Sequence, residues 1–258
     1  MRMHHEGVTV AITNWNHELF LPRSIGSALA AVAQLRKNSF VAEVLVVDDA
    51  SRDGSLTLLR QLEAECFTAG LRVLGRVHNG GPAQARNHAL RNARSRFVLF
   101  LDADNELVPE NVPTLCRSLL ETEAAAVFGN LLVKTAASRE AFHVLSNESF
   151  QERMFQDNYI DTLAMYDREQ LLDVGGFSDR VETQEDFELW LHLASNGRKI
   201  VFVPVVAGYY CALPRSFNLG QWQKTYPIIH RIYDQVGARH HLRSATRHLR
   251  YHPAIGYV

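Results

Sequence analysis

The chain has 258 residues, 47% of them apolar, and its 27 Lys and Arg residues nearly balance its 28 Asp and Glu residues. The high apolar content and the net charge of only -1 exclude an intrinsically disordered chain. The length allows one large α/β domain and is sufficient for a hydrophobic core without disulfide bonds.

Charge is divided unevenly along the chain. From Lys224 onward there are six basic residues and one acid, whereas the preceding 223 residues contain 21 basic and 27 acidic residues. We therefore expect a main domain at residues 1–223, with a net charge of -6, and a basic helical tail at residues 224–258, with a net charge of +5. An acidic main domain argues against nucleic acid as a partner, because a phosphate backbone selects for a strong positive patch. The basic tail could contact an anionic membrane.

The cysteines and the apolar segments indicate the compartment. Cys66, Cys116 and Cys211 lie far apart without a C-x-x-C pair, which fits a reducing compartment and neither a disulfide framework nor a zinc site. The N-terminal apolar run is too short for a secretory signal. The longest apolar stretch, which begins at Ile200, is shorter than the ~20 residues of a membrane-spanning helix. We expect a cytoplasmic protein, with peripheral membrane contact as an option for the tail.

Short apolar runs alternate with segments of helical periodicity. Strands are predicted over Val8–Thr13, Val41–Asp49, Leu71–Val77, Arg96–Asp104, AAVFGNLLVKT and KIVFVPVV. Helices are predicted over Glu18–Leu35, from the SRDGS turn through Glu65, within NGGPAQARNHALRNA, over Pro109–Glu123 and within EDFELWLHLASNG. This alternation is typical of βαβ units, so the predicted fold class is α/β, with a mostly parallel, Rossmann-like central sheet flanked by helices.

Acidic pairs follow two of the predicted strands. Asp48 and Asp49 close the second strand, and Asp102 and Asp104 close the fourth. Ligands bind at the carboxyl ends of parallel strands, so we expect both pairs at one edge of the sheet. An Asp-x-Asp pair on a tight turn suits a hard divalent cation. The alternative for each pair alone is a solvated turn or a helix cap, and only their combination favours a site.

A third acidic pair, Glu185 and Asp186, lies at the start of a predicted helix. One interpretation is that these charges complement the helix dipole, which contributes ~0.3–1 kcal/mol. The other is catalytic, because a helix start can hold a carboxylate rigidly within reach of an attacking hydroxyl. NGGPAQARN does not match G-x-G-x-x-G, and no G-x-x-x-x-G-K-[ST] occurs, so neither a dinucleotide site nor a P-loop is supported.

The order of the motifs resembles that of the inverting family 2 glycosyltransferases, which have the GT-A fold. The resemblance extends from Val8 to Tyr210 and rests on VTVAITNWN, EVLVVDDASRDGS, NGGPAQARNHAL, FVLFLDADN, VGGF and QEDFELWLHL. It implies a metal-dependent enzyme that uses Mn²⁺ or Mg²⁺ and moves a sugar from a nucleotide sugar, UDP-linked, to an acceptor. The acceptor hydroxyl would belong to a saccharide, a lipid-linked molecule or another compound.

The resemblance also assigns residues to the nucleotide. Thr13 and Trp15 match first-strand residues that line the base. Asp49, with Asp48 beside it, matches the acid that hydrogen-bonds the uracil ring. Arg86 matches a basic residue close to the nucleotide.

Metal and catalytic roles follow from the other motifs. Asp102, Ala103 and Asp104 match the Asp-x-Asp motif, with Asp104 as the direct metal ligand and Asp102 as a further ligand near the ribose. Asp186 matches the catalytic base. His230 is a candidate third metal ligand.

The sequence departs from the family pattern after the last predicted strand. The family often has a Tyr-Arg pair at this point, but this sequence has Cys211 and Ala212 there, and Arg215 comes later. The basic residue that binds the diphosphate therefore stays open. Two other functions stay open. A catalytically silent nucleotide-sugar-binding or scaffold protein would have the same fold. A nucleotidyltransferase would need a glycine-rich loop after the first strand, which ITNWNHELFLPRS lacks.

Overall fold

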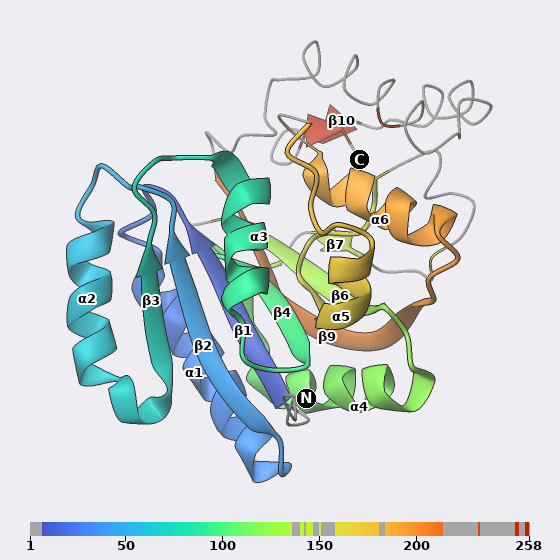
Figure 1. Ribbon diagram of the computed structural model, residues 1–258, viewed down its shortest axis with the longest axis horizontal. Helices are drawn as coiled ribbons and strands as arrows, with labels where there is room; N and C mark the ends of the chain where they lie inside the picture. Colours follow the sequence, from blue (N-terminus) through green and yellow to red (C-terminus); the bar gives the residue numbers. More distant parts are fainter. Residues whose placement is uncertain are drawn as a thin grey trace.

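The structure is a computed structural model that describes residues 7–135, 140–141, 143–146, 150, 158–180, 184–213, 232, 251–252 and 256–257. Within these ranges a nine-stranded sheet forms the centre of the molecule, and helices cover both of its faces (Figure 1).

The N-terminal half is a run of parallel strands joined by helices. In chain order its elements are β1 (Gly7–Asn14), α1 (Leu21–Lys37), β2 (Val41–Asp48), α2 (Ser55–Glu65), the short 3-10 helix η1 (Phe67–Ala69), β3 (Leu71–Gly75), α3 (Gly81–Asn92) and β4 (Phe97–Asp102). The strands lie in the order β3-β2-β1-β4, all parallel. In this register Asn14 of β1 is opposite Asp48 of β2, and Thr13 is opposite Asp102 of β4. The predicted acidic strand ends therefore lie at one edge of the sheet.

The C-terminal half continues the same sheet with mixed strand directions. Its elements are β5 (Glu106–Leu107), η2 (Pro109–Asn111), α4 (Val112–Thr122), β6 (Ala126–Thr135), β7 (His143–Leu145), β8 (Ala164–Asp167), α5 (Arg168–Asp173), α6 (Glu185–Ser195) and β9 (Ile200–Ala212). The order β4-β8-β6-β9-β5 places β8 antiparallel between β4 and β6, while β6 and β9 run parallel. A separate hairpin pairs β10 (Tyr251–His252) with β11 (Gly256–Tyr257).

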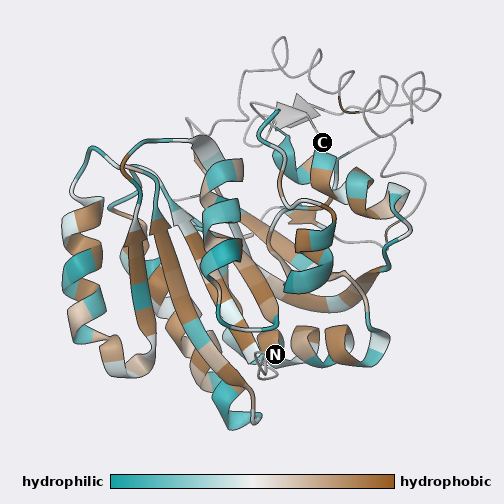
Figure 2. Cartoon of the chain, viewed as in Figure 1, coloured by the Kyte–Doolittle hydropathy of each residue, from teal (hydrophilic) through white to brown (hydrophobic). Residues whose placement is uncertain are grey.

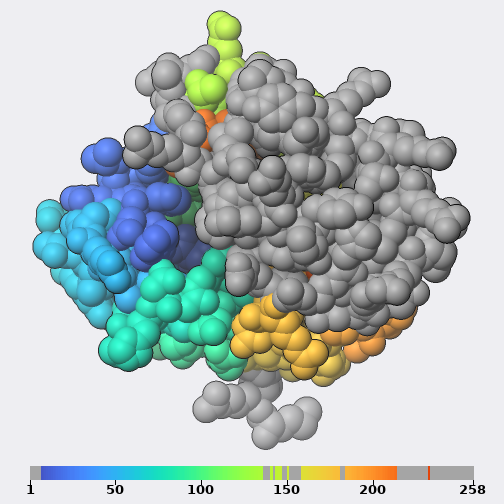
Figure 3. Space-filling view, turned by 90° about the horizontal axis from the view of Figure 1, so that it is seen from above, coloured from blue at the N-terminus to red at the C-terminus, as the bar shows by residue number. Residues whose placement is uncertain are grey.

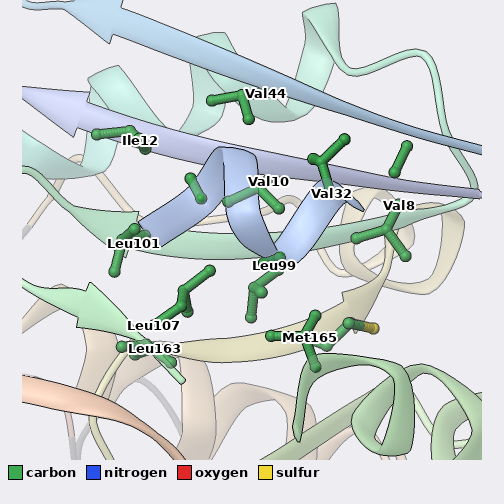
Figure 4. Close-up of a cluster of buried hydrophobic side chains, with 14 of the residues drawn as sticks. Val8, Val10, Ile12, Val32, Val44, Leu99, Leu101, Leu107, Leu163 and Met165 are labelled. Carbon is green, nitrogen blue, oxygen red and sulfur yellow. The ribbon is translucent and has the colours of Figure 1, made fainter. Parts of the chain in front are cut away.

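Two apolar cores lie on opposite faces of the sheet, because successive side chains of a strand point to opposite sides. Val10 of β1 belongs to the first core, beneath α1 and α4, which Figure 4 shows in close-up. Its neighbour Ala11 belongs to the second core, with α3, α5 and α6. Trp190 of α6 is fully buried there and donates Nε1–H to the Ile160 carbonyl at 3.0 Å, which fixes α6 against the chain before β8. Figure 2 shows the apolar strands between helices of mixed hydropathy.

The element boundaries differ from the sequence predictions at several places. The helix expected from Glu18 begins at Leu21, because Glu18 instead accepts a hydrogen bond from the Gly54 amide at 2.9 Å. The fourth strand ends at Asp102, where the Asn105 amide turns back to the Asp102 carbonyl at 3.0 Å. The last strand extends to Ala212, beyond the expected end. The antiparallel β8 was not predicted.

Candidate active site

The carboxyl ends of β1, β2 and β4 form one edge of the molecule, which Figure 3 shows from above. Loops of the N-terminal half, in blue to teal, lie on one side of this view, and the chain around the start of α6, in yellow to orange, lies beside them. The predicted site residues meet at this edge.

Asp48 is locked inside the turn after β2. Its carboxylate accepts hydrogen bonds from Asn14 Nδ2 at 2.7 Å, from Ser51 Oγ at 2.6 Å and from the Ser51 amide at 3.0 Å. The residue is fully buried. These contacts give Asp48 a role in shaping the loops after β1 and β2, and its expected contact with the nucleotide stays a prediction.

Replacing Asp48 by Ala is expected to lower the free energy of unfolding by about 2–4 kcal/mol, because buried donors of Asn14 and Ser51 lose their acceptor. Asp53→Ala is the matched control in the same turn. Asp53 is exposed and accepts from the amides of Glu18 and Ser55, so its loss is expected to stay below about 1 kcal/mol. Urea unfolding measures the free energy of unfolding of both variants. Equal losses would contradict the proposal that the hydrogen bonds of Asp48 stabilise the turn.

Asp49 connects the end of β2 to the start of α3. Its buried carboxylate pairs with Arg76 and accepts from the amides of Gly80 at 3.1 Å and Gly81 at 2.8 Å. Gly81 has a φ of 80°, in the left-handed region that glycine adopts without strain. The first amides of a helix have no partner within the helix, so a carboxylate here is favourable. Asp49 is thereby held in place for its predicted contact with the base.

Arg86 joins the end of β4 to the start of α6. Its Nη2 donates to Asp102 Oδ1 at 2.8 Å and its Nη1 to Glu185 Oε1 at 2.5 Å, across 99 residues of sequence in the second case. Thr13 Oγ1 donates to the same Asp102 oxygen at 3.2 Å. Arg86 is buried, its guanidinium lies over the Phe177 ring at 5.5 Å, and the two carboxylates raise its pKa despite burial. The chain of contacts therefore links three separate motifs through one permanently charged side chain.

Acids at and near the Asp-x-Asp turn have raised pKa values. Burial and the neighbouring charge of Asp102 raise the pKa of Asp104 to about 7. Burial and the same charge also raise the pKa of Asp161, in the chain before β8, to about 7. Ala103 between the two motif acids is fully buried in the first core, and its amide donates to the Thr13 carbonyl at 3.2 Å. The Ala103 side chain therefore anchors the turn, and only its backbone is placed to contact a ligand.

Asp186 lies in the first turn of α6, next to Glu185. Its Oδ1 accepts from the Phe187 amide at 2.7 Å and from Asn158 Nδ2 at 3.4 Å. Burial, the charge of Glu185 and the charge of Asp161 raise its pKa to about 7. A carboxylate with such a pKa is suited to accept a proton near neutral pH.

Asn158 and Asp161 belong to the site but were missed by sequence reasoning. Both lie in NYIDT, a segment without a known motif, directly before a strand of four residues. Only the helix after that strand had a signal, because Asp167 caps α5 by accepting from the Gln170 amide at 3.1 Å, and a D-x-x-Q pair often marks a helix start.

The remaining predicted residues differ in how far the structure describes them. Trp15 is 50% exposed on the loop after β1, where its ring is free to stack on a planar ligand. Cys211 is buried, and its amide donates to Asn105 Oδ1 at 2.9 Å, which ties the end of β9 to the Asp-x-Asp turn. Arg215 and His230 lie outside the described residues, as does most of the basic tail. Ile232 of that tail is buried in the second core.

Two family models match this chain. The model described as glycosyl transferase family 2 matches residues 9–173, and the one described as glycosyl transferase family group 2 matches residues 97–255. The chain belongs to glycosyl transferase family 2. The family expected from the motifs is therefore confirmed, and with it the assignment of the chain to the glycosyltransferases.

Curated relatives of the chain include bacterial glycosyltransferases. The chain is 26% identical over 185 residues to the putative teichuronic acid biosynthesis glycosyltransferase TuaG of Bacillus subtilis, covering 70% of this chain and 71% of TuaG. It is 24% identical over 231 residues to the UDP-Glc:alpha-D-GlcNAc-diphosphoundecaprenol beta-1,3-glucosyltransferase WfgD of Escherichia coli, covering 89% and 85%.

Solved structures of glycosyltransferases share the fold. S. aureus TarS 1-349 in complex with UDP-GlcNAc superposes with a TM-score of 0.67 at 19% identity, covering 90% of this chain and 66% of that chain. The mannosyltransferase PcManGT from Pyrobaculum calidifontis, in complex with GDP-Man and Mn²⁺, superposes with a TM-score of 0.64 at 20% identity, covering 95% and 74%. These likenesses confirm the predicted α/β GT-A fold. No helix in the described part of the chain combines the length and apolar character needed to cross a membrane.

Proposed function

We propose that this family 2 member is a metal-dependent inverting glycosyltransferase with Asp186 as its catalytic base. The substrates would be a nucleoside diphosphate sugar, UDP-linked, and an acceptor hydroxyl. The observation that carries the proposal is the contact chain from Thr13 and Asp102 through Arg86 to Glu185. The two Nη atoms of Arg86 bind one acid of the proposed donor-side motif and the neighbour of the proposed base.

The Asp-x-Asp turn fits a hard divalent cation. Asp102 and Asp104 supply two carboxylates, and desolvation together with the charge of Asp102 raises the pKa of Asp104, a cost that a bound cation relieves. Mg²⁺ commonly takes one or two carboxylates and fills its other positions with water and substrate phosphates. The described residues hold no cluster of three or more His, Cys, Asp or Glu side chains suited to a metal ion, which agrees with a site completed by the substrate. When bound there, Mn²⁺ or Mg²⁺ would neutralise charge that develops on the leaving diphosphate.

The protein residues account for the proton and the orientation of the reactants. Asp186 takes the proton of the acceptor hydroxyl, whose oxygen forms a bond to the anomeric carbon. The bond from that carbon to the diphosphate oxygen breaks, and the nucleoside diphosphate leaves with the electron pair. Attack from the face opposite the diphosphate inverts the anomeric configuration. Asp49 and Trp15 would hold the nucleotide base. Arg86 would keep Asp102 and the start of α6 in fixed relative positions through its two ion pairs.

Similarity to other transferases supports the substrate classes. TarS and PcManGT were solved with UDP-GlcNAc and with GDP-Man and Mn²⁺, and WfgD is named for UDP-Glc and a diphosphoundecaprenol acceptor. A lipid-linked acceptor would bring the enzyme to a membrane surface, where the basic tail from Lys224 onward carries the complementary charge. Cytoplasmic location with peripheral membrane contact is part of this proposal.

The metal role is tested by Asp104→Ala. This variant is expected to weaken UDP binding by about tenfold or more with Mn²⁺ present, because the cation loses a protein ligand. Without metal, wild type and variant are expected to bind UDP with similar affinity. Calorimetric titration with UDP, with and without Mn²⁺, measures all four affinities. A wild-type affinity that does not change when Mn²⁺ is added would contradict the role of the Asp-x-Asp turn.

A further inference from the structure

Asn158 touches the proposed base from outside α6. Its Nδ2 donates to Asp186 Oδ1 at 3.4 Å and to Gln184 Oε1 at 3.1 Å. Gln184 directly precedes α6 and has a φ of 64°, which a residue with a side chain rarely adopts. One amide group therefore contacts both the strained residue before the helix and the carboxylate in its first turn.

The two residues that follow Asn158 are anchored through their backbone carbonyls. The Ile160 carbonyl accepts from Trp190 Nε1 of α6 at 3.0 Å. The Tyr159 carbonyl accepts from the Ser146 amide at 3.0 Å. Tyr159 and Ile160 are both buried in the second core. Asn158 is thus held over the start of α6 by contacts that do not involve its own side chain.

The second polar atom of the Asn158 amide is also informative. Oδ1 is buried and has no hydrogen-bond donor among the described residues. In the orientation of the structure the amide therefore donates to Asp186 through Nδ2 and leaves its acceptor unused, and a hydrogen bond to the charged form of an acid favours that form.

We infer that Asn158 is a positioning residue that orients the Asp186 carboxylate and favours its ionised form. This inference rests on the proposed function, because it assigns a partner to the proposed base. Other charged or titratable groups also interact with Asp186: Glu185 of its own helix, Asp161 before β8, Arg86 of α3, Tyr166 of β8 and Tyr210 of β9. Asn158 differs from these groups because it does not titrate and its side chain donates a hydrogen bond to the carboxylate.

The test uses the Phe187 amide, which lies 2.7 Å from Asp186 Oδ1 and so reports the protonation of that acid. Phenylalanine carrying a heavy-nitrogen label is incorporated, and the Phe187 signal is followed by NMR against pH without donor or acceptor. Asp186→Asn identifies the titration that belongs to this acid. Wild type is expected to titrate near a pKa of about 7.

Asn158→Leu removes the donor and is expected to raise the midpoint by about half a pH unit to one pH unit, because the ionised form loses a hydrogen bond. Asn158→Ala removes the same donor without filling the space with a larger side chain, and the same shift is expected. Gln184→Ala is the matched control: it removes the other partner of Asn158 and is expected to leave the midpoint within about 0.2 pH unit of wild type.

A midpoint that stays unchanged or falls in both Asn158 variants would overturn the inference. So would a wild-type Phe187 signal without a titration that Asp186→Asn abolishes. The experiment needs no substrate, so its result is separate from that of a transfer assay. A raised midpoint in a protein that transfers no sugar would contradict the proposed function and leave the role of Asn158 intact.

Discussion

Asp186→Asn is expected to lose sugar transfer and to keep nearly all of its affinity for UDP. The amide has the shape of the carboxylate but cannot take up the proton of the acceptor hydroxyl, and loss of a general base typically lowers the rate by about 10²–10⁴-fold. In the proposed function UDP is held instead by the loops after β1 and β2 and by the Asp-x-Asp turn, none of which has a hydrogen bond to Asp186 among the described contacts. Nucleotide release from a donor and calorimetric titration with UDP measure the two quantities.

The pH dependence of the wild-type rate follows from the same residue. Burial and the charges of Glu185 and Asp161 raise the pKa of Asp186 to about 7. An acid is protonated below its pKa and then cannot serve as a base, so the rate is expected to rise with pH through about 7. Asp179, an exposed acid before α6, serves as the control, because Asp179→Asn leaves the base intact and is expected to keep the wild-type rate. Transfer by Asp186→Asn at the wild-type rate would show that another group is the base.

Arg86→Ala is expected to lower the free energy of unfolding by about 3–5 kcal/mol. The substitution removes the cation between two carboxylates, Asp102 and Glu185, and leaves negative charge with no partner in a largely buried setting. It also removes the packing of the guanidinium on the Phe177 ring. Arg86→Lys is expected to recover only part of this loss, because one ammonium group cannot reproduce the two-armed contact. Urea unfolding at neutral pH measures these differences.

The matched control for Arg86 is Arg198→Ala. Arg198 Nη2 lies 3.5 Å from Asp173 Oδ2 in a pair whose side chains are 32% and 64% exposed. Exposed pairs contribute only about 0–1 kcal/mol, so this variant is expected to unfold almost like wild type. If Arg86→Ala lowered the free energy of unfolding no more than Arg198→Ala does, the ion pairs of Arg86 with Asp102 and Glu185 would not stabilise the fold.

The sequence predicted the N-terminal half of the fold well because β1, β2 and β4 are apolar runs that end in acids. Parallel strands bring such ends to one edge whatever the details of the loops. The contact of Arg86 with Glu185 could not be predicted, because it depends on how α6 packs against α3 and not on spacing along the chain. The same holds for Asn158 and Asp161, which reach the site through β8, a four-residue antiparallel strand with too short a pattern to detect.

The tertiary contacts also distinguish the roles of Asp48 and Asp49. In the sequence Asp48 and Asp49 are equivalent neighbours. In the structure Asp48 is bound to Asn14 and Ser51 of the turn, whereas Asp49 faces Arg76 and the first amides of α3. Asp48 is the last residue of β2 and Asp49 follows it, and their carboxylates bind different partners, so the two consecutive acids cannot serve the same ligand in the same way.

Turnover of a panel of nucleotide sugars tests the proposed function most directly. Wild type and Asp186→Asn are each incubated with Mn²⁺, a UDP-sugar or GDP-sugar and a saccharide acceptor or water. NMR then follows the release of the nucleotide and the anomeric proton of the first sugar product. An inverting transferase releases the nucleotide from at least one donor, gives a product of the opposite anomeric configuration and loses this activity in Asp186→Asn. Donors that bind to the wild type and are never consumed, or a product that keeps the donor configuration, would contradict it.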